Sequence, residues 1–367
     1  MKKGFLFGWL LIPVLMLSGQ IPLKDQPVKG EWNFKPEKVW EISKAGDEDF
    51  GQIGELLVSD AGRVFVRDFK KNISYIFDEN GRFLKAFAPQ GKEAGQLPYY
   101  LNRFQAGEKI VLAAPDKLHF FSQDGVFERT VDNNLFLRFP LRFPNENEFI
   151  YAPNFPQSPV QEKKLVLVDL ASGKENILAD FADPGEGKPG PGAMLMIPSL
   201  TPQVRLACDG NIMAFGRTDR YTLFLAVASG KIASSFSLNR PNGTASLEDR
   251  QRLVEETSIP KERQDAIVRM LPNTLTAFSH VEAVHGLICV YAVAGTASVI
   301  GSQKIDMFSE KGDYLYSGTI AFGEGLKFNS PANLLLKGDF LYVVLVDGQG
   351  RQTLAKFKIA WPSKENR

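Results

Sequence analysis

The stretch from Phe50 to about Leu97 constrains the fold of this chain more than any other part. It contains four short apolar runs: Leu56–Val58, Val64–Val66, Ile73–Phe77 and Phe83–Phe87. Apolar residues alternate within the runs with a period of two, which is typical of strands, and Asp, Asn and Gly residues between the runs suit turns. Four strands joined by hairpins, followed by a glycine-containing return, predict one blade of a β-propeller.

The same four-strand unit recurs along the chain, at about 95–131, 133–181, 199–238 and from about 273. A sixth, incomplete unit follows, with the runs A-N-L-L-L-K-G, F-L-Y-V-V-L-V-D and Q-T-L-A-K-F-K-I. A glycine-containing hairpin comes before the fourth strand in the first three units, at Asp78–Arg82, Gln123–Gly125 and Asp169–Lys174. The last unit has only three strands before the chain ends, so we expect the lone strand Lys38–Ser43 to supply the fourth. This pairing leaves no open edge in the ring and predicts six blades of roughly 40–45 residues each.

The strand pattern breaks between the fourth and fifth units. Ser246–Asp249 has the form of a capping box, and a second helical run starts near Pro260, which together predict a helical insert at about 244–272. One face of the second helix carries apolar residues that we expect to pack on the propeller: Ala266, Ile267, Met270 and Leu271.

The fold class is therefore all-β. We predict one six-bladed β-propeller over residues 38–362, closed by its N-terminal strand, with the helical insert between blades four and five and a tail at 363–367. Residues 20–37 are polar and contain several prolines, and they are expected to form an exposed lead-in. A monomer is expected.

The N-terminus resembles a targeting segment. Met1–Lys3 is basic, and the apolar run from Gly4 to about Gly19 is interrupted by Pro13 and shorter than the ~20 residues of a spanning helix. Residues 1–19 are therefore predicted to be a Sec-type signal peptide, with an uncleaved anchor as the alternative. Either reading places the body of the protein in the periplasm or outside the cell, with no other membrane insertion.

Charge and cysteine content narrow the function further. The 43 Lys and Arg residues balance 42 Asp and Glu residues, giving a formal net charge of +1. Such balance argues against nucleic-acid binding and against an anionic membrane as partner. Cys208 and Cys289 lie in apolar strand contexts, which favours two buried free cysteines, although export leaves a disulfide open.

The residues Phe50–Phe87 resemble an NHL repeat: F-G at the start, V-S-D-A-G-R-V-F-V-R-D in the middle and N-I-S-Y-I-F-D-E-N-G-R-F-L at the end. As a whole the chain is similar to exported bacterial six-bladed propellers of the NHL-repeat-like or TolB-like group. That resemblance implies the propeller fold. It implies no particular activity, because most of that group has no assigned one.

No catalytic signature is present. The chain has three histidines, His119, His280 and His285, and the last two would face opposite sides of a strand. The sequence contains no G-x-S-x-G elbow and no evident Cys–His pair. We therefore predict no catalytic residues, no metal ligands and no cofactor.

Binding residues are predicted from position instead. In a propeller, the loops between the second and third strands of each blade gather around one mouth of the central channel. These loops contribute charged and amide side chains, a usual mixture in binding sites: Arg67, Asp68, Asp116, Asn154, Arg217, Asp219, Arg220, Asp347 and Arg351. The alternative is that these aspartates cap turns and these arginines are solvated.

These sequence features are compatible with two candidate functions. The first is a non-enzymatic binding or scaffold propeller that engages a protein, peptide or glycan through a loop-lined face or channel mouth. The alternative is a metal-dependent hydrolase or lyase, similar to the lactonase or lyase propellers, with a calcium-like divalent cation at the channel. Asp68, Asp116, Asp219 and Asp347 could supply carboxylates, but the neighbouring arginines disfavour a tight cation site.

Overall fold

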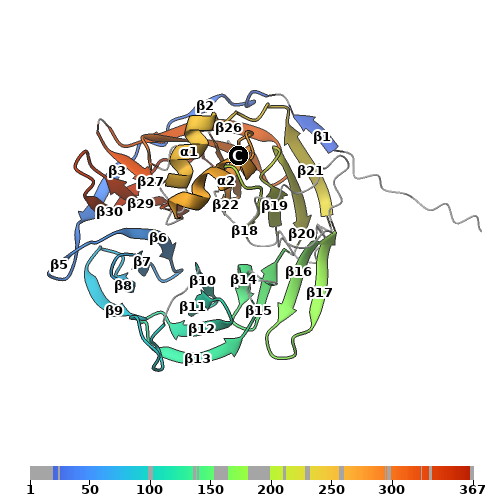
Figure 1. Cartoon of the computed structure of the whole chain (residues 1–367). Coiled ribbons are helices and arrows are strands. Elements are labelled where there is room, and N and C mark those ends of the chain that lie inside the picture. Colours follow the sequence, from blue (N-terminus) through green and yellow to red (C-terminus); the bar gives the residue numbers. More distant parts are fainter. Residues whose placement is uncertain are drawn as a thin grey trace, which may run out of the picture.

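The structure is a computed structural model, and it describes residues 20–23, 25–97, 102–134, 138, 140–152, 164–180, 199–209, 212–227, 232–255, 260–293, 295, 299–323, 325–329 and 333–363. Six of the seven sheets in the described part of the chain are arranged around a central axis (Figure 1). The prediction of an all-β six-bladed β-propeller is confirmed.

Blades 1 to 3 are antiparallel four-stranded sheets in which each strand pairs with the next in the chain. Blade 1 consists of β6 (Ile53–Val58), β7 (Val64–Asp68), β8 (Ile73–Phe77) and β9 (Phe83–Phe87). Blade 2 consists of β10 (Asn102–Ala106), β11 (Lys109–Ala114), β12 (Lys117–Ser122) and β13 (Phe127–Asp132). Blade 3 consists of β14 (Pro140–Asn145), β15 (Glu148–Tyr151), β16 (Lys164–Asp169) and β17 (Glu175–Asp180).

Blades 4 and 5 each carry a fifth, outermost strand from the N-terminal segment. Blade 4 consists of β18 (Val204–Asp209), β19 (Ile212–Arg217), β20 (Thr222–Val227) and β21 (Ile232–Leu238), with β1 (Gln20–Leu23) parallel to β21. Blade 5 consists of β22 (Phe278–Val284), β23 (Leu287–Ala292), β25 (Ser302–Ser309) and β26 (Tyr314–Ala321), with β2 (Glu31–Trp32) parallel to β26.

Blade 6 closes the ring as the sequence predicted. Its strands are β28 (Leu334–Lys337), β29 (Phe340–Val346), β30 (Gln352–Lys358) and β3 (Glu37–Ile42), and β3 pairs antiparallel with β30. Two short strands not foreseen from the sequence extend the same sheet, β24 (Val299–Ile300) and β27 (Lys327–Asn329). A separate hairpin of β4 (Lys44–Ala45) and β5 (Glu48–Asp49) leads from blade 6 into blade 1.

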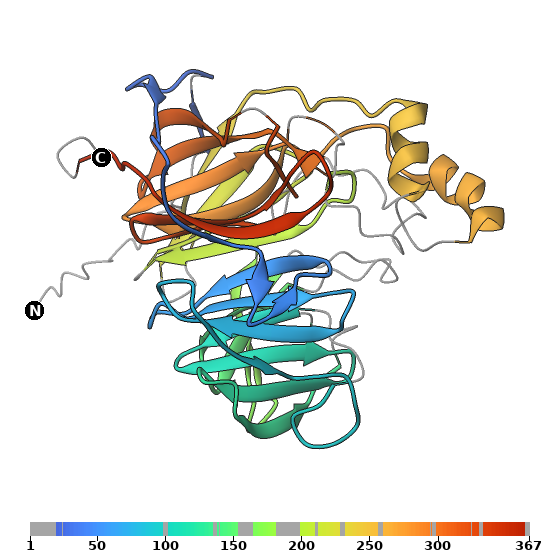
Figure 2. The same cartoon turned by 90° about the vertical axis from the view of Figure 1, so that its left-hand side faces the viewer.

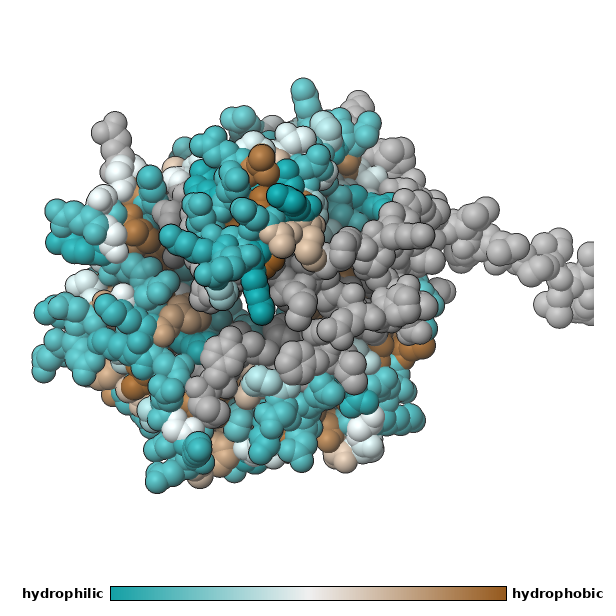
Figure 3. All heavy atoms as spheres, in the orientation of Figure 1, coloured by the Kyte–Doolittle hydropathy of each residue, from teal (hydrophilic) through white to brown (hydrophobic). Residues whose placement is uncertain are grey.

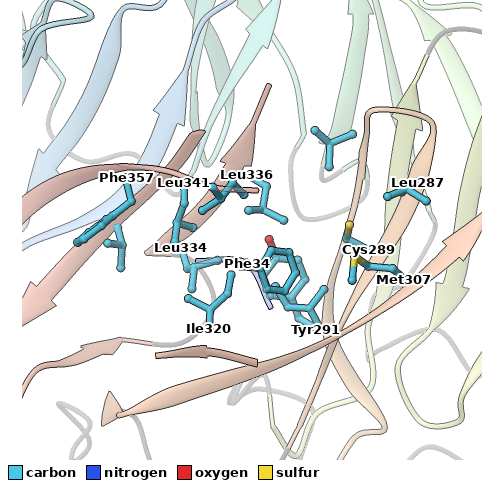
Figure 4. Close-up of a cluster of buried hydrophobic side chains, with 14 of the residues drawn as sticks. Phe34, Leu287, Cys289, Tyr291, Met307, Ile320, Leu334, Leu336, Leu341 and Phe357 are labelled. Carbon is cyan, nitrogen blue, oxygen red and sulfur yellow. The ribbon is translucent and has the colours of Figure 1, made fainter. Parts of the chain in front are cut away.

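One hydrophobic cluster fills each of the six interfaces between neighbouring blades. The second strand of a blade lies between two such clusters, which explains why β7 and β23 read as continuous apolar runs and are almost entirely buried. Figure 4 shows the cluster between blades 5 and 6, where Phe34, Tyr291 and Phe357 pack with Met307 and several leucines. Burial of each such side chain stabilises the ring by about 1.5–3 kcal/mol.

The recurrent hairpin before the fourth strand depends on glycine. In blade 1, Gly81 has a φ of 80° and donates its N–H to the carbonyl of Asp78, and Gly125 repeats this in blade 2 with a φ of 69° and a bond to Ser122. Residues with a side chain rarely adopt this left-handed conformation. The prediction that the hairpin recurs is confirmed.

The helical insert consists of α1 (Leu247–Glu255) and α2 (Lys261–Met270), which project from one face of the ring (Figure 2). The capping box is present: Asp249 N–H donates to Ser246 Oγ at 3.0 Å, and Ser246 N–H donates to Asp249 Oδ2 at 3.1 Å. The insert packs as expected, but through a slightly different stripe. In α2 the inward residues are Ile267 and Val268, followed by Leu271.

Ala266 and Met270 are therefore not part of the buried face of α2. Both are exposed, Met270 at 40%. The buried stripe is instead completed by residues outside the helices, namely Leu200 before blade 4 and Leu275 before blade 5. The buried face of α2 differs from the predicted one because the helix packs against these apolar residues of the adjoining segments.

The N-terminal segment is more deeply built into the ring than an exposed lead-in. Besides forming β1 and β2, it buries Phe34 completely, and Trp32 Nε1 donates to the carbonyl of Ala360 at 2.9 Å. The physical reason is that the outer strands of blades 4 and 5 offer free backbone edges, which an extended segment can pair with. The signal peptide predicted for residues 1–19 lies outside the described residues. No helix in the described part of the chain is long and apolar enough to cross a membrane.

Candidate functional site

The loops between second and third strands lie on the same face as the helices, which we call the helix face. Ala277, at the end of the insert, donates its N–H to the carbonyl of Thr218 in the corresponding loop of blade 4, at 2.7 Å. Val293, at the start of the loop of blade 5, packs against the helical cluster. Figure 3 shows this face as mostly hydrophilic over the described residues, with scattered hydrophobic side chains. The predicted binding residues that the structure describes therefore belong to loops of this one face.

Asp68, at the end of β7, is fully buried and holds its loop together. Its carboxylate accepts four backbone N–H groups, at 2.7 to 3.1 Å, from Gly51, Gln52, Lys70 and Lys71. A carboxylate with four such donors has little capacity left for a cation or ligand. For this predicted residue the turn-capping alternative describes the structure.

Arg67 is also buried, with 3% of its surface exposed, and it lies beneath an aromatic ring. Its Nη2 donates to Asn72 Oδ1 at 3.0 Å, and its guanidinium carbon is 4.9 Å from the centre of the Phe69 ring. Phe69 itself is 42% exposed. Its ring edge lies against Gly54 so closely that a Cβ there would come within 2.9 Å of Cε2. Phe69 is thus an exposed residue of this loop, together with Lys70 and Lys71, and it is not among the predicted binding residues.

In blade 4, Arg217 and Asp219 form an ion pair at 3.2 Å, and Asn242 Nδ2 donates to the carbonyl of Asp219 at 2.7 Å. Arg220 lines a groove of about 550 Å³ with seven other residues, among them Arg240. The ion pair brings two of the predicted residues together, and Arg220 follows Asp219 in the same loop.

Arg240 ties this groove to blade 5. Its Nη1 is 2.6 Å from Oδ2 of the fully buried Asp306, which also accepts the hydroxyls of Tyr221 and Tyr314 at 2.7 and 2.6 Å. Burial, followed by the hydrogen bond to Asp306, raises the pKa of Tyr314 to about 12. The network links the outer strands of two blades and so has a structural role.

The other predicted residues are exposed or cap turns. Asp116 is exposed in its loop, and its carbonyl accepts the N–H of Asn133 at 2.8 Å. Asp347 accepts the backbone N–H of Gln349 and Arg351 and pairs with Arg351 Nε at 2.7 Å, which lowers the pKa of its carboxyl. Asn154 lies outside the described residues. Within the described ranges, no three His, Cys, Asp or Glu side chains gather as a metal site, and Cys208 and Cys289 form no disulfide.

A second set of polar residues, missed by the loop-based prediction, lies on the innermost strands. We call it the inner ring. It takes one residue from each blade, close to the end of the inner strand nearest the helix face: Glu55, Arg103, Arg142, Arg205, His280 and Asn333.

Several members of the inner ring bridge neighbouring blades. Arg103 Nη2 donates to the carbonyl of Gly54 in blade 1 at 2.9 Å, and Arg205 Nε donates to the carbonyl of Ser279 in blade 5 at 2.8 Å. Asn333 Oδ1 accepts the N–H of Glu55 at 2.7 Å. An innermost strand has an unpaired backbone edge, and these side chains satisfy part of it.

Glu55 is the unusual member. It occupies a bulge of β6 with a φ of 51°, a conformation that is costly for a residue with a side chain. Its Oε2 is buried without a hydrogen-bond partner. Burial raises the pKa of this carboxyl, while the charges of Arg103 and Arg67 act in the opposite direction. Backbone strain and buried polar atoms without a partner both reduce stability, and in proteins they are concentrated at functional sites.

His280 lies beside a carboxylate of its own strand. Its Nε2 is 3.6 Å from Oε1 of Glu282, whose other oxygen accepts the Tyr291 hydroxyl and the N–H of Leu336 in blade 6. His280 is 37% exposed, whereas Glu282 is nearly buried. His285 is separate, in a turn where its ring is 2.9 Å from Asp339. The expectation that the two histidines do not act together fits this placement.

The sequence did contain a signal for the inner ring. The first strands of blades 2 to 4 each carry an arginine near their start, in N-R-F-Q-A, P-L-R-F-P and V-R-L-A-C. An arginine in three successive units at that position is evident once the units are aligned on their first strands. The prediction of binding residues favoured the loops instead, because binding and catalytic residues are usually located on loops.

A scan against protein-family models found no match to this sequence, and a search among curated proteins found none. Solved structures are similar in fold. A member of the DUF4221 family from Bacteroides vulgatus has a TM-score of 0.60 and 12% identity, over 90% of this chain and 99% of that chain. A Bacteroides fragilis protein, whose name proposes that it is exported, has a TM-score of 0.50 and 14% identity, over 94% of this chain and 100% of that chain.

A virginiamycin B lyase from Staphylococcus aureus is also similar, with a TM-score of 0.43 and 10% identity, over 89% of this chain and 100% of that chain. The similarity in fold to the two Bacteroides proteins confirms the expected resemblance to bacterial propellers of this broad group. At these identities it concerns the fold alone.

Proposed function

We propose that this protein is an exported, non-enzymatic binding propeller that engages a protein, peptide or glycan through its helix face, beside blade 1. The observation that carries the proposal is Phe69. Among the described residues it is the only aromatic side chain in the group of exposed large hydrophobic residues, and it covers Arg67 and Gly54. Exposed aromatic side chains next to charged and amide groups are frequent anchors of binding sites.

The surroundings of Phe69 support this role. Gly54 and the amide of Asn333 lie under the ring, and Glu55 follows Gly54 in the bulge. Asp68 fixes the loop from below through its four backbone hydrogen bonds, so the ring is presented by a rigid support. A preorganised anchor loses less entropy on binding than a mobile one.

The choice of binding over catalysis has separate support. Asp68 and Asp347, two of the carboxylates that the metal-dependent alternative would use, are occupied by backbone N–H groups. Export is proposed from the basic and apolar N-terminal sequence, with a periplasmic or extracellular location.

The test is a binding screen of the purified protein on arrays of glycans and of peptides, followed by affinity measurements on the ligands found. Phe69→Ala should weaken binding at least about tenfold, since a central aromatic anchor contributes 2 kcal/mol or more. Ile177→Ala is the matched control, because Ile177 is 60% exposed on an outer strand far from the helix-face loops. It should bind as the wild type does.

Equal binding by Phe69→Ala and wild type would overturn the proposed site. Metal analysis of the purified protein tests the enzymatic alternative. A stoichiometric divalent ion, together with turnover that is lost on chelation, would replace the binding proposal with a metal-dependent reaction.

A further inference from the structure

The groove in blade 4 lies where the chain enters β20 and where it leaves β21 toward the helical insert. It has a volume of about 550 Å³, which is a usual size for a small-molecule pocket. Its lining residues are Arg220, Tyr221, Thr222, Ser237, Leu238, Asn239, Arg240 and Asn242. Tyr221 and Leu238 are buried, whereas the other six are half-buried or exposed. A ligand in the groove would therefore meet mainly hydrogen-bonding side chains.

Arg240 is held in a fixed position at this groove. Its Nη1 contacts Oδ2 of Asp306 at 2.6 Å, and its Nη2 donates to the Tyr314 hydroxyl at 2.8 Å and to the carbonyl of Asp25 at 3.4 Å. A guanidinium has five N–H groups. These three contacts therefore leave the N–H of Nε and one N–H of Nη1 for another acceptor. Because the side chain is 25% exposed and already ordered, Arg240 loses little entropy when it binds a ligand.

Other polar groups of the groove also have hydrogen-bonding capacity for a ligand. Thr222 and Ser237 are opposite each other in the pairing of β20 with β21. The Thr222 hydroxyl and the Asn239 amide make no hydrogen bond to another described residue. Asn242 uses its Nδ2, which donates to the carbonyl of Asp219 at 2.7 Å, and keeps its Oδ1. Hydroxyls and amides both donate and accept, as the hydroxyl groups of a sugar require.

The charges at the groove favour an anionic group on the ligand. Two arginines line it, and none of the eight lining residues is acidic. The nearby acids are occupied elsewhere: Asp306 is fully buried against Arg240, and Asp219 forms its ion pair with Arg217. Asp25 contacts Arg240 through its carbonyl and not through its carboxylate. Guanidinium N–H groups match the geometry of carboxylate and phosphoryl oxygens.

We propose that this groove binds a small sugar that carries an oxyanion, either a carboxylate or a phosphoryl group. Arg220 and Arg240 bind the oxyanion, and Thr222 and Asn239 bind sugar hydroxyls. The groove belongs to blade 4 and the Phe69 surface to blade 1, so this is a second site, beyond the proposed function. Free monosaccharides measure it separately, and either proposal can fail while the other holds.

The experiment is isothermal titration of the full chain with sodium glucuronate and with glucose 6-phosphate, and with glucose as the neutral sugar, all at one ionic strength. Wild type should bind at least one of the acidic sugars with a stoichiometry of one, and at least about tenfold more tightly than glucose. Binding of glucuronate alone identifies a carboxylate site, and binding of glucose 6-phosphate alone identifies a phosphoryl site. Binding of both supports the chemistry that they share.

Asn239→Asp adds a carboxylate to the groove without a change of size. Asn239 is exposed and its amide makes no hydrogen bond to another described residue, so the variant should fold. Repulsion should weaken binding of the acidic sugar about tenfold or more. Arg220→Gln should weaken it roughly tenfold to a hundredfold, the contribution of one charge-assisted hydrogen bond. Asn80→Asp is the matched control, because it adds the same charge at an exposed turn of blade 1, and it should bind as wild type does.

Three results would overturn the proposal: no binding of either acidic sugar, binding of glucose as tightly as the better acidic sugar, or unchanged binding by Asn239→Asp. If Arg220→Gln fails to fold, Asn239→Asp still decides the question. Phe69→Ala should leave the titration unchanged. Loss of binding in that variant would place the sugar at the Phe69 surface and would also overturn the assignment to the groove.

Discussion

Two carboxylates of blade 1, Asp68 on the second strand and Glu55 on the first, lie in opposite physical situations. Asp68 is buried and accepts four backbone N–H groups. Glu55 is strained at φ 51° and has a buried oxygen without a partner. The Asp68 carboxylate is satisfied by the backbone around it, whereas Glu55 has the charges of Arg103 and Arg67 nearby but leaves Oε2 without a hydrogen-bond partner.

The difference separates polar groups that build the ring from those available to a ligand. Loop aspartates are hydrogen-bonded because a turn leaves backbone N–H groups without a strand partner, and a nearby carboxylate is the easiest acceptor. Inner-strand polar groups face an axis where no further strand can pair. Some of their polar atoms, such as Oε2 of Glu55, are therefore left without a hydrogen-bond partner.

The largest expected effect is at the satisfied carboxylate. Asp68→Ala leaves four backbone N–H groups without their acceptor, so we expect the free energy of unfolding to fall by about 3 kcal/mol. Chemical denaturation measures this loss. Asp347→Ala, at a more exposed turn, should lose clearly less. Equal losses would show that burial of Asp68 adds nothing to its hydrogen bonds.

Gly54→Ala tests the support of Phe69. The new Cβ would lie 2.9 Å from Phe69 Cε2 and 3.1 Å from Asn333 Oδ1, so the ring must move. We expect a loss of about 1 kcal/mol of stability and a displaced Phe69, visible in a crystal structure of the variant. Gly348→Ala, where no atom lies within 4 Å, should cost nothing comparable.

Glu55→Gly should raise the free energy of unfolding, whereas the two substitutions above should lower it. Glycine adopts a positive φ without strain, and the change also removes the unpartnered carboxyl, so we expect a gain of about 1 kcal/mol in the free energy of unfolding. The same change at Glu41, in the regular strand β3, should destabilise. A loss at Glu55 would mean that its carboxyl contributes to stability, and the contrast with Asp68 would disappear.

The smallest expected effects are changes in stability with pH. Burial raises the pKa of Glu55 above its ordinary 4.5, so the stability that this carboxyl contributes relative to Glu55→Gln is present below pH 4.5 and is lost as pH rises through the folded-state pKa. Hydrogen bonds from Arg351 lower the pKa of Asp347 from 3.8. Its contribution relative to Asp347→Asn is therefore present above pH 3.8 and lost as pH falls. Denaturation curves across the acid range should show these opposite slopes, and parallel slopes would contradict the comparison.

Local pattern was sufficient for most of the fold. The strands of blade 1, the glycine hairpins and the closing strand β3 follow from period-two alternation and turn chemistry, which depend on a few neighbouring residues. The additions β1 and β2 were not predictable in this way. Their partners lie about 215 and 286 residues later in the chain, and a two- or four-residue strand has no periodicity to recognise.

The residues of the candidate sites, like the fold, could be predicted only in part from the sequence. Residue types and turn positions alone placed Arg67, Asp68 and Asp347 in helix-face loops, because a hairpin determines where its own tip lies. Whether those side chains point outward depended on the tertiary structure. Closure of the ring brings distant strands together and decides which polar groups find partners. By itself, then, the sequence determined the blades and their order. Only the closed ring decided that the Asp68 carboxylate would bind the backbone of its own loop, while Oε2 of Glu55 would be buried without a hydrogen-bond partner.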